Sequence, residues 1–172
     1  MMIELILGGA RSGKSALAEQ KAIASGLTVT YVATANPVDM VEDSEMLARI
    51  AQHRAQRPAE WLVVEEPLYL ATLLKSLAAP EKLLLVDCLT LWLSNLLYKD
   101  AVLKETQALL DVLPTLPGHV ILVSNEVGMG IVPLGELTRR YVDEAGRLHQ
   151  KVAAQADRVT FVAAGLPLVL KG

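Results

Sequence analysis

Eight residues near the amino terminus have the types and spacing needed to bind phosphate groups. They complete a G-x-x-x-x-G-K-S pattern directly after the apolar run Ile3–Leu7. Glycines in such a loop let successive backbone N–H groups converge on phosphate oxygens at the start of a helix. A glycine turn that carries Lys-Ser by chance is the alternative, which the flanking strand and helix patterns disfavour. The pattern predicts a nucleotide-binding loop made of Gly8, Gly9, Ala10, Arg11, Ser12, Gly13, Lys14 and Ser15.

A second stretch carries the acid that this chemistry needs. Lys82–Asp87 is an apolar run that closes in a carboxylate, the usual form of a Walker-B strand. Such an acid at the carboxyl end of a central parallel strand holds Mg²⁺ directly or through water. The Ser15 hydroxyl is a second hard oxygen ligand, while Lys14 reaches the β- and γ-phosphates. Ser15 and Asp87 are therefore the predicted metal ligands, and Lys14 is a predicted catalytic residue.

The single cysteine and two of the three histidines are expected to be structural. Cys88 lies at the end of an apolar strand, which is typical of a buried thiol, and a lone cysteine excludes an internal disulfide. His119 begins a strand and His149 lies within a helix. Neither histidine has an acid or a second ligand at a useful spacing in the sequence.

Strand patterns alternate with helix patterns along the chain and position these residues. The fold class predicted from this alternation is a single α/β domain over residues 1–172, with three layers and a mostly parallel sheet. The short link Ala164-Gly165 predicts a final antiparallel edge hairpin. The strands are expected at Ile3–Leu7, Thr28–Ala33, Trp61–Val64, Lys82–Asp87, His119–Ser124, Arg158–Ala163 and Leu166–Leu170. The helices are expected at Ala16–Ser25, Leu68–Leu77, Leu89–Tyr98, Ala101–Val112 and Leu134–Ala156, with another that begins at Asp43 or Ser44.

Three local features of these elements carry further expectations. Pro67 is expected to open its helix, because proline suits a first helical position. Gly146 interrupts the last long helix, and close packing there is the expected compensation for its cost of about 1 kcal/mol against alanine. Asn125–Pro133 follows a strand and combines a polar pair, two glycines and exposed apolar residues, as ligand and partner contacts often do.

Length, charge and hydropathy limit the classes of function. The chain has 172 residues and a net charge of −3, and no basic face stands out, so nucleic acid is not an expected partner. No apolar run approaches the length of a membrane span, and the first residues are too short for a signal peptide. We therefore expect a cytoplasmic protein that binds a small phosphorylated ligand.

Several of these motifs together resemble one enzyme family. The glycine loop, Ala48-Arg49-Ile50 with His53, Arg57-Pro58 and above all Asn125–Pro133 are similar to the bifunctional adenosylcobinamide kinase/adenosylcobinamide-phosphate guanylyltransferase of cobalamin biosynthesis. The likeness runs from Met1 to about Lys171 and includes Ala145-Gly146-Arg147. It implies a RecA-like P-loop fold that assembles as a homotrimer.

The resemblance also implies the reactions and the residues that perform them. The family phosphorylates the aminopropanol hydroxyl of adenosylcobinamide with ATP or GTP, then transfers GMP from GTP to adenosylcobinamide phosphate. The second step passes through a guanylylated histidine, which by its place in the motif is His53 here. A neutral imidazole can attack the α-phosphorus and divide one difficult transfer into two easier ones. The implied nucleotide contacts beyond the glycine loop are Ala33, Thr34, Ala35, Arg54, Ala55, Gln56, Arg57, Glu65 and Asp87.

Other interpretations remain open at this point. Without the resemblance, His53 reads as a solvated helix residue near Arg49 and Arg54, and Glu65 as a solvated strand end. One alternative is a P-loop kinase for another small molecule, with no covalent intermediate. Another is a RecA-like nucleotide-switch ATPase, although a guanine-reading Asn-Lys-x-Asp is absent at Asn125.

Overall fold

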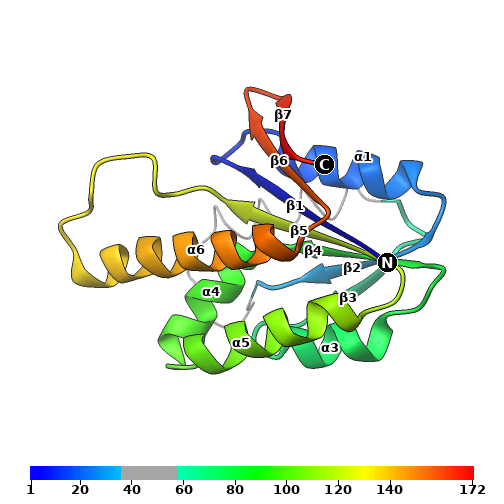
Figure 1. The fold of residues 1–172 in the computed structure, drawn as a ribbon, viewed down its shortest axis with the longest axis horizontal. Coiled ribbons are helices and arrows are strands. Elements are labelled where there is room, and N and C mark those ends of the chain that lie inside the picture. Colours follow the sequence, from blue (N-terminus) through cyan, green and yellow to red (C-terminus); the bar gives the residue numbers. More distant parts are fainter. Residues whose placement is uncertain (36–57) are drawn as a thin grey trace.

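The computed structural model describes residues 1–35 and 58–172 of the chain. A seven-stranded sheet with the order β3-β2-β4-β5-β1-β6-β7 runs through it (Figure 1). All neighbouring strands are parallel except β6 and β7, which pair antiparallel. The predicted mostly parallel sheet with an antiparallel edge strand is therefore confirmed. The strands are β1 (Met2–Gly8), β2 (Thr28–Ala33), β3 (Leu62–Glu65), β4 (Lys82–Asp87), β5 (His119–Asn125), β6 (Arg158–Ala163) and β7 (Leu166–Lys171).

Helices cover both faces of this sheet. In Figure 1, α1 lies on one face, and α3, α4, α5 and α6 lie on the other. Ala18 and Ala22 of α1 are buried against the first face, and Trp92 of α4 is fully buried in the larger core on the second. The three layers follow from these two cores. The helices are α1 (Lys14–Ala24), α3 (Leu70–Leu77), α4 (Leu89–Tyr98), α5 (Val102–Val112) and α6 (Glu136–Gln155), with a short 3₁₀ turn η1 (Leu113–Thr115).

Two local predictions are wrong. Pro67 does not open α3, which begins at Leu70. The Glu66 carboxylate accepts the backbone N–H groups of Leu68 and Tyr69 at 2.9 and 2.8 Å, and this turn delays the helix. Gly146 is not closely packed either, because a methyl group added there would meet no described atom within 4 Å apart from its chain neighbours and the backbone of its own helix.

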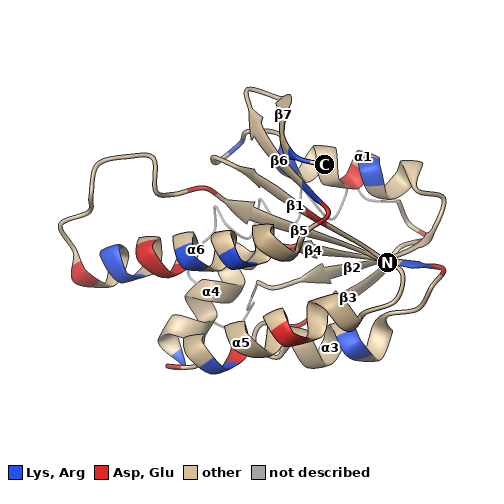
Figure 2. Cartoon of the chain, in the orientation of Figure 1, with Lys and Arg blue, Asp and Glu red and all other residues tan. Residues whose placement is uncertain are grey.

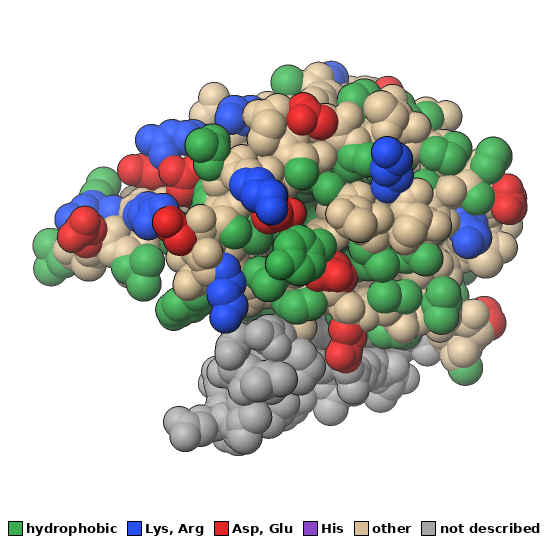
Figure 3. All heavy atoms as spheres, turned by 90° about the horizontal axis from the view of Figure 1, so that it is seen from below, with side chains coloured by type: hydrophobic (Ala, Val, Ile, Leu, Met, Phe, Trp, Pro, Cys, Tyr) green, Lys and Arg blue, Asp and Glu red, His purple; other side chains and the backbone are tan. Residues whose placement is uncertain are grey.

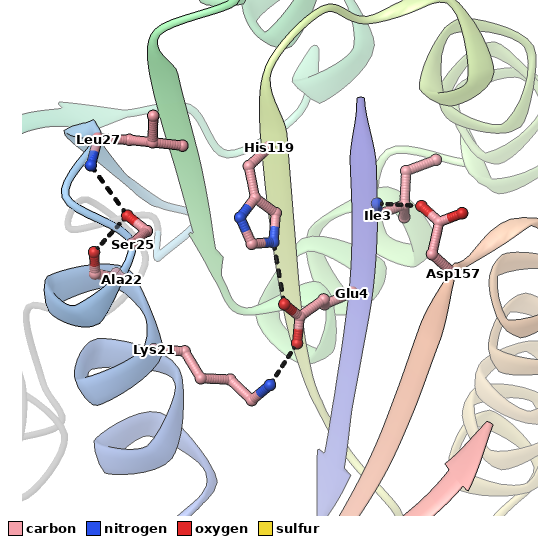
Figure 4. Close-up of polar contacts among 8 residues, drawn as sticks. All are labelled: Ile3, Glu4, Lys21, Ala22, Ser25, Leu27, His119 and Asp157. Carbon is pink, nitrogen blue, oxygen red and sulfur yellow. Dashed lines mark hydrogen bonds and ion pairs between the residues drawn. The ribbon is translucent and has the colours of Figure 1, made fainter. Parts of the chain in front are cut away.

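A buried charge cluster joins α1 to the amino edge of the sheet (Figure 4). Glu4 of β1 is 3% exposed, and its carboxylate lies 2.6 Å from Lys21 Nζ and 3.1 Å from His119 Nε2. Burial alone raises the pKa of Glu4, but hydrogen bonds and charges from His119 and Lys21 outweigh it and lower that pKa to about 2. This acid stays ionised, with two basic side chains beside it, and fixes the position of α1.

An apolar segment projects beyond the other end of the sheet. The chain between β5 and α6 extends from the body of the molecule in Figure 1, and hydrophobic side chains are visible at the same end in Figure 3. Met129, Ile131, Val132 and Leu134 are each at least 72% exposed. The exposed apolar residues predicted within Asn125–Pro133 are confirmed.

Candidate functional site

The predicted site residues of four strands meet at the carboxyl edge of the sheet. Gly8 at the end of β1 pairs with Asn125 at the end of β5. Ala33 at the end of β2 pairs with both Asp87 of β4 and Glu65 of β3. In parallel α/β sheets, ligands bind beyond the carboxyl ends of the strands. The topology thus gathers residues that lie far apart in the sequence.

The glycine loop has a backbone that larger residues do not tolerate. A Cβ at Gly8 would lie 2.5 Å from Ser12 Oγ and 2.6 Å from the Val162 carbonyl oxygen, and Gly13 has a φ of +94°. The turn of the β6–β7 hairpin supports the loop, since the Gly165 N–H donates to the Ser12 carbonyl at 2.8 Å. The hairpin therefore helps to fix the loop in front of α1.

Lys14 is held inside this loop. Its side chain is buried, and its Nζ donates to the Gly9 carbonyl at 3.1 Å. Burial lowers its pKa, while the negative charge of Asp87 acts in the opposite direction. Ser12 Oγ is also buried and has no hydrogen-bond partner in the part of the chain that the structure describes. A buried cation and an unpaired hydroxyl in one loop suit a phosphate ligand.

Asp87 is oriented by a neighbouring strand. Tyr31 of β2 donates its hydroxyl to Asp87 Oδ2 at 3.0 Å. The Thr34 hydroxyl is engaged elsewhere: it donates to the Cys88 carbonyl and accepts the Cys88 N–H at 3.0 Å. Burial, followed by the charge of Asp87, raises the pKa of the Cys88 thiol to about 11, so this thiol is protonated at neutral pH.

The oxygen donors at this edge fit Mg²⁺ chemistry. Ser15 at the start of α1 and Asp87 are both half-buried, and each offers a hard oxygen. Within residues 1–35 and 58–172, three or more His, Cys, Asp or Glu side chains nowhere gather into a metal cage. A serine hydroxyl and a carboxylate suit Mg²⁺, which keeps several waters and binds through one or two protein ligands plus phosphate.

The remaining predicted site residues are placed less centrally. Ala33 and Ala35 are half-buried at the end of β2, Glu65 is exposed at the end of β3, and Ala10 and Arg11 are exposed in the glycine loop. The other predicted residues lie outside the described ranges, namely His53, Arg54, Ala55, Gln56 and Arg57.

The sequence analysis missed a polar network behind the edge. His149 of α6 is buried, its Nε2 lies 2.8 Å from Ser124 Oγ, and its Nδ1 lies 3.7 Å from Glu126 Oε2. His119 also faces an acid, Glu4. Each histidine therefore has an acid partner that spacing in the sequence does not indicate, because both acids are distant in sequence and adjacent in the fold.

Two further observations concern the charge pattern of α6 and the hydropathy of the helices. Figure 2 shows Lys and Arg interleaved with Asp and Glu along α6, rather than gathered on one side of it. None of the helices in the described ranges combines the length and hydrophobicity needed to cross a membrane.

Comparison with known proteins identifies the family. The sequence matches the family described as cobinamide kinase/cobinamide phosphate guanyltransferase over residues 4–170. The chain belongs to this family. It is 60% identical over 174 residues to the bifunctional adenosylcobalamin biosynthesis protein CobP of Pseudomonas aeruginosa, covering 99% of this chain and 98% of that protein. It is 39% identical over 186 residues to the bifunctional protein CobU of Salmonella typhimurium, covering 99% and 100%.

Solved structures support the fold of this cobinamide kinase/guanyltransferase family member. The Pyrococcus horikoshii protein PH0250 aligns with a TM-score of 0.58 at 8% identity, covering 99% of this chain and 86% of that one. The flagellar accessory protein FlaH of Methanocaldococcus jannaschii aligns with a TM-score of 0.50 at 14% identity, covering 99% and 78%. At these identities the likeness concerns the fold alone.

Proposed function

We propose that this chain phosphorylates adenosylcobinamide with ATP or GTP and then transfers GMP from GTP to adenosylcobinamide phosphate. Family membership over residues 4–170 carries the proposal. The geometry agrees with it, since the glycine loop and Asp87 lie at one edge of the sheet, where a nucleoside triphosphate can reach both. The two activities then share one polyphosphate site.

In this proposal the residues at the carboxyl edge of the sheet have separate roles. Backbone N–H groups of the glycine loop and Lys14 bind the phosphates and offset the charge of the leaving group. Ser15 and Asp87 are the proposed Mg²⁺ ligands, and the ion would supply further charge neutralisation at the phosphates. Tyr31 keeps the Asp87 carboxylate oriented.

For guanylyl transfer we propose a covalent intermediate on His53. The motif supports this assignment, and the residue itself lies outside the described ranges. The imidazole nitrogen bonds to the α-phosphorus as the bond to the pyrophosphate oxygen breaks, and the corrinoid phosphate oxygen then displaces the imidazole. Incubation with α-labelled GTP tests this step. An acid-labile, alkali-stable label that disappears in His53→Ala is expected, and an unlabelled wild-type protein contradicts it.

Location and assembly are also proposals. We propose a homotrimer, as the family resemblance implies, built of single-domain subunits and located in the cytoplasm, as the length and composition of the chain suggest. The apolar side chains from Val127 to Leu137 are exposed, and we propose that they contact either the corrinoid or another subunit.

The decisive assay supplies adenosylcobinamide with ATP and with GTP in separate reactions. Phosphorylation with either nucleotide, and formation of adenosylcobinamide-GDP with GTP, are the expected products. A P-loop kinase for another small molecule would not phosphorylate adenosylcobinamide with either nucleotide. A nucleotide-switch ATPase would hydrolyse nucleotide at a rate that added cobinamide does not change.

A further inference from the structure

We infer that Glu126 is the general base that removes the proton from the acceptor hydroxyl during phosphorylation, and that His149 is the residue that positions it. The inference rests on the proposed kinase activity. It starts from a buried network on β5, α4 and α6 that the nucleotide site described above does not use.

The position of Glu126 places it beside the glycine loop. Glu126 directly follows β5, which lies between β1 and β4 in the sheet. Its backbone N–H donates to the Gly8 carbonyl at 3.0 Å, at the first residue of the loop. Its side chain is 24% exposed, so solvent or substrate can reach the carboxylate. Glu126 therefore lies at the carboxyl edge between the phosphate-binding loop and Asp87.

Within the described residues, the contacts of this carboxylate come from neutral groups. Oε1 accepts the Gly128 N–H at 2.6 Å, and Oε2 lies 3.7 Å from His149 Nδ1. In the ranges that the structure describes, no Lys or Arg forms an ion pair with Glu126. A carboxylate that is ordered by neutral groups, and is not neutralised by a cation, suits proton abstraction.

A chain of hydrogen-bonding side chains, Thr90, Ser124 and His149, lies behind Glu126. Thr90 of α4 accepts the Asn125 N–H at 2.7 Å, and its hydroxyl lies 3.5 Å from Ser124 Oγ. Ser124 contacts His149 Nε2 at 2.8 Å. His149 is 6% exposed, and among the described residues its Nδ1 has no hydrogen-bond partner.

His149 is suited to hold Glu126 without neutralising it. Burial lowers the pKa of His149, although Glu126 acts to raise it, so the ring is neutral at pH 7. When Nε2 accepts a hydrogen bond from the Ser124 hydroxyl, the single N–H of the neutral ring is on Nδ1, which faces Glu126 Oε2. In this tautomer, a small movement of Glu126 towards the ring is enough for Nδ1–H to donate a hydrogen bond to Oε2.

Phosphorylation with Glu126 as the base forms one bond to phosphorus and breaks another. The acceptor oxygen forms a bond to the γ-phosphorus, the bond from that phosphorus to the β,γ-bridging oxygen breaks, and its electron pair stays on the departing nucleoside diphosphate. The hydroxyl proton passes to a Glu126 oxygen and then to solvent. Guanylyl transfer needs no such base, because its acceptor is a phosphate that is already ionised near neutral pH.

This difference gives the test. The rates of corrinoid phosphorylation and of guanylyl transfer to corrinoid phosphate are measured separately, and their ratio is compared between variants. Glu126→Gln keeps the shape and an oxygen for the Gly128 N–H, and we expect it to lower the kinase-to-transferase ratio on the order of 100-fold. Glu126→Asp retains a carboxylate, so a smaller fall is expected, and it serves as the second variant if the glutamine protein does not fold.

Variants of His149 test the positioning role. An asparagine amide lies about where Nδ1 does and can donate to Glu126, whereas a glutamine amide reaches towards Ser124 instead. His149→Asn should therefore keep a higher ratio than His149→Gln. His119→Gln is the matched control: it also removes a histidine that faces a glutamate, at the opposite edge of the sheet, and should leave the ratio unchanged.

The outcomes separate this inference from the proposed function. A wild-type ratio in Glu126→Gln, or in Glu126→Asp if only that protein folds, overturns the assignment of the base. Equal ratios in the two His149 variants overturn the positioning role. A wild-type protein that lacks corrinoid phosphorylation contradicts the proposed kinase activity, and this inference with it.

Discussion

The two edges of the sheet use buried charge in opposite ways. At the amino edge, the Glu4 carboxylate forms an ion pair with Lys21 and also contacts His119. At the carboxyl edge, Lys14 donates to the Gly9 backbone carbonyl, and Glu126 faces a neutral histidine. Ion pairs therefore stabilise the amino edge, whereas the charged groups at the carboxyl edge remain available to bind a ligand.

The largest expected effect is the loss of activity when Lys14, one of the two lysines of α1, is replaced. Lys14→Ala should lower both activities by at least about 100-fold, because it removes the side-chain cation at the phosphates. Lys21→Ala, the matched control on the same helix, should keep both activities and lose stability, since Lys21 pairs with Glu4. Steady-state rates and urea unfolding measure both effects. Equal losses of activity in the two variants would remove the distinction between the edges.

His53→Ala comes next in size and should divide the two activities. We expect guanylyl transfer to fall to background while phosphorylation continues, because only guanylyl transfer needs the nucleophile. His119→Ala serves as the histidine control. Equal loss of both activities in a folded His53→Ala protein, judged by circular dichroism, would contradict separate roles.

Glu4→Gln is expected to affect stability alone. The pKa of Glu4 is about 2 in the folded chain against 4.5 as its ordinary value, a difference of 2.5 units. A lowered folded-state pKa stabilises the protein above the unfolded value, so this contribution is present at pH 7 and is lost as the pH falls from about 4.5 towards 2. It amounts to at most about 3 kcal/mol.

Urea unfolding at pH 7 and pH 3 measures this contribution. Wild-type protein should lose more stability between the two pH values than Glu4→Gln, which has no charge to titrate. A pH dependence of the same size in both proteins would show that the amino-edge cluster contributes no net stability.

Tyr31→Phe has the smallest expected effect. It removes one hydrogen bond to Asp87, worth about 1 kcal/mol, and should raise the Mg²⁺ concentration for half-maximal binding of GTP roughly fivefold. Calorimetric titration provides this measurement. Tyr141→Phe is the control, because the Tyr141 hydroxyl donates to the Thr90 carbonyl instead. An unchanged Mg²⁺ requirement in Tyr31→Phe would mean that Asp87 needs no such support.

Much of the fold follows from local sequence signals. The bounds of β2, β4 and α4 match their predicted ranges, because β-branched or apolar runs with clear stops define them. The final hairpin follows from the short link Ala164-Gly165, where both residues have a positive φ, 51° and 77°, a conformation that glycine adopts without strain. Pro67 was misplaced because the Glu66 side chain competes with the helix for backbone N–H groups.

The site was only partly accessible from the sequence. The glycine loop and Asp87 carry their own motif and needed no tertiary information. The partners Glu4 with His119 and Glu126 with His149 are brought together by strand order and helix packing, which no spacing rule expresses. The expected packing at Gly146 failed for the same reason, since what a helix face meets depends on the whole fold.

The most direct measurement is a crystal structure with Mg²⁺ and a non-hydrolysable GTP analogue. The account predicts that the β- and γ-phosphates lie in the loop from Gly8 to Ser15, and that Lys14 Nζ leaves the Gly9 carbonyl to contact them. A triphosphate bound elsewhere, with Lys14 still on Gly9, would contradict it.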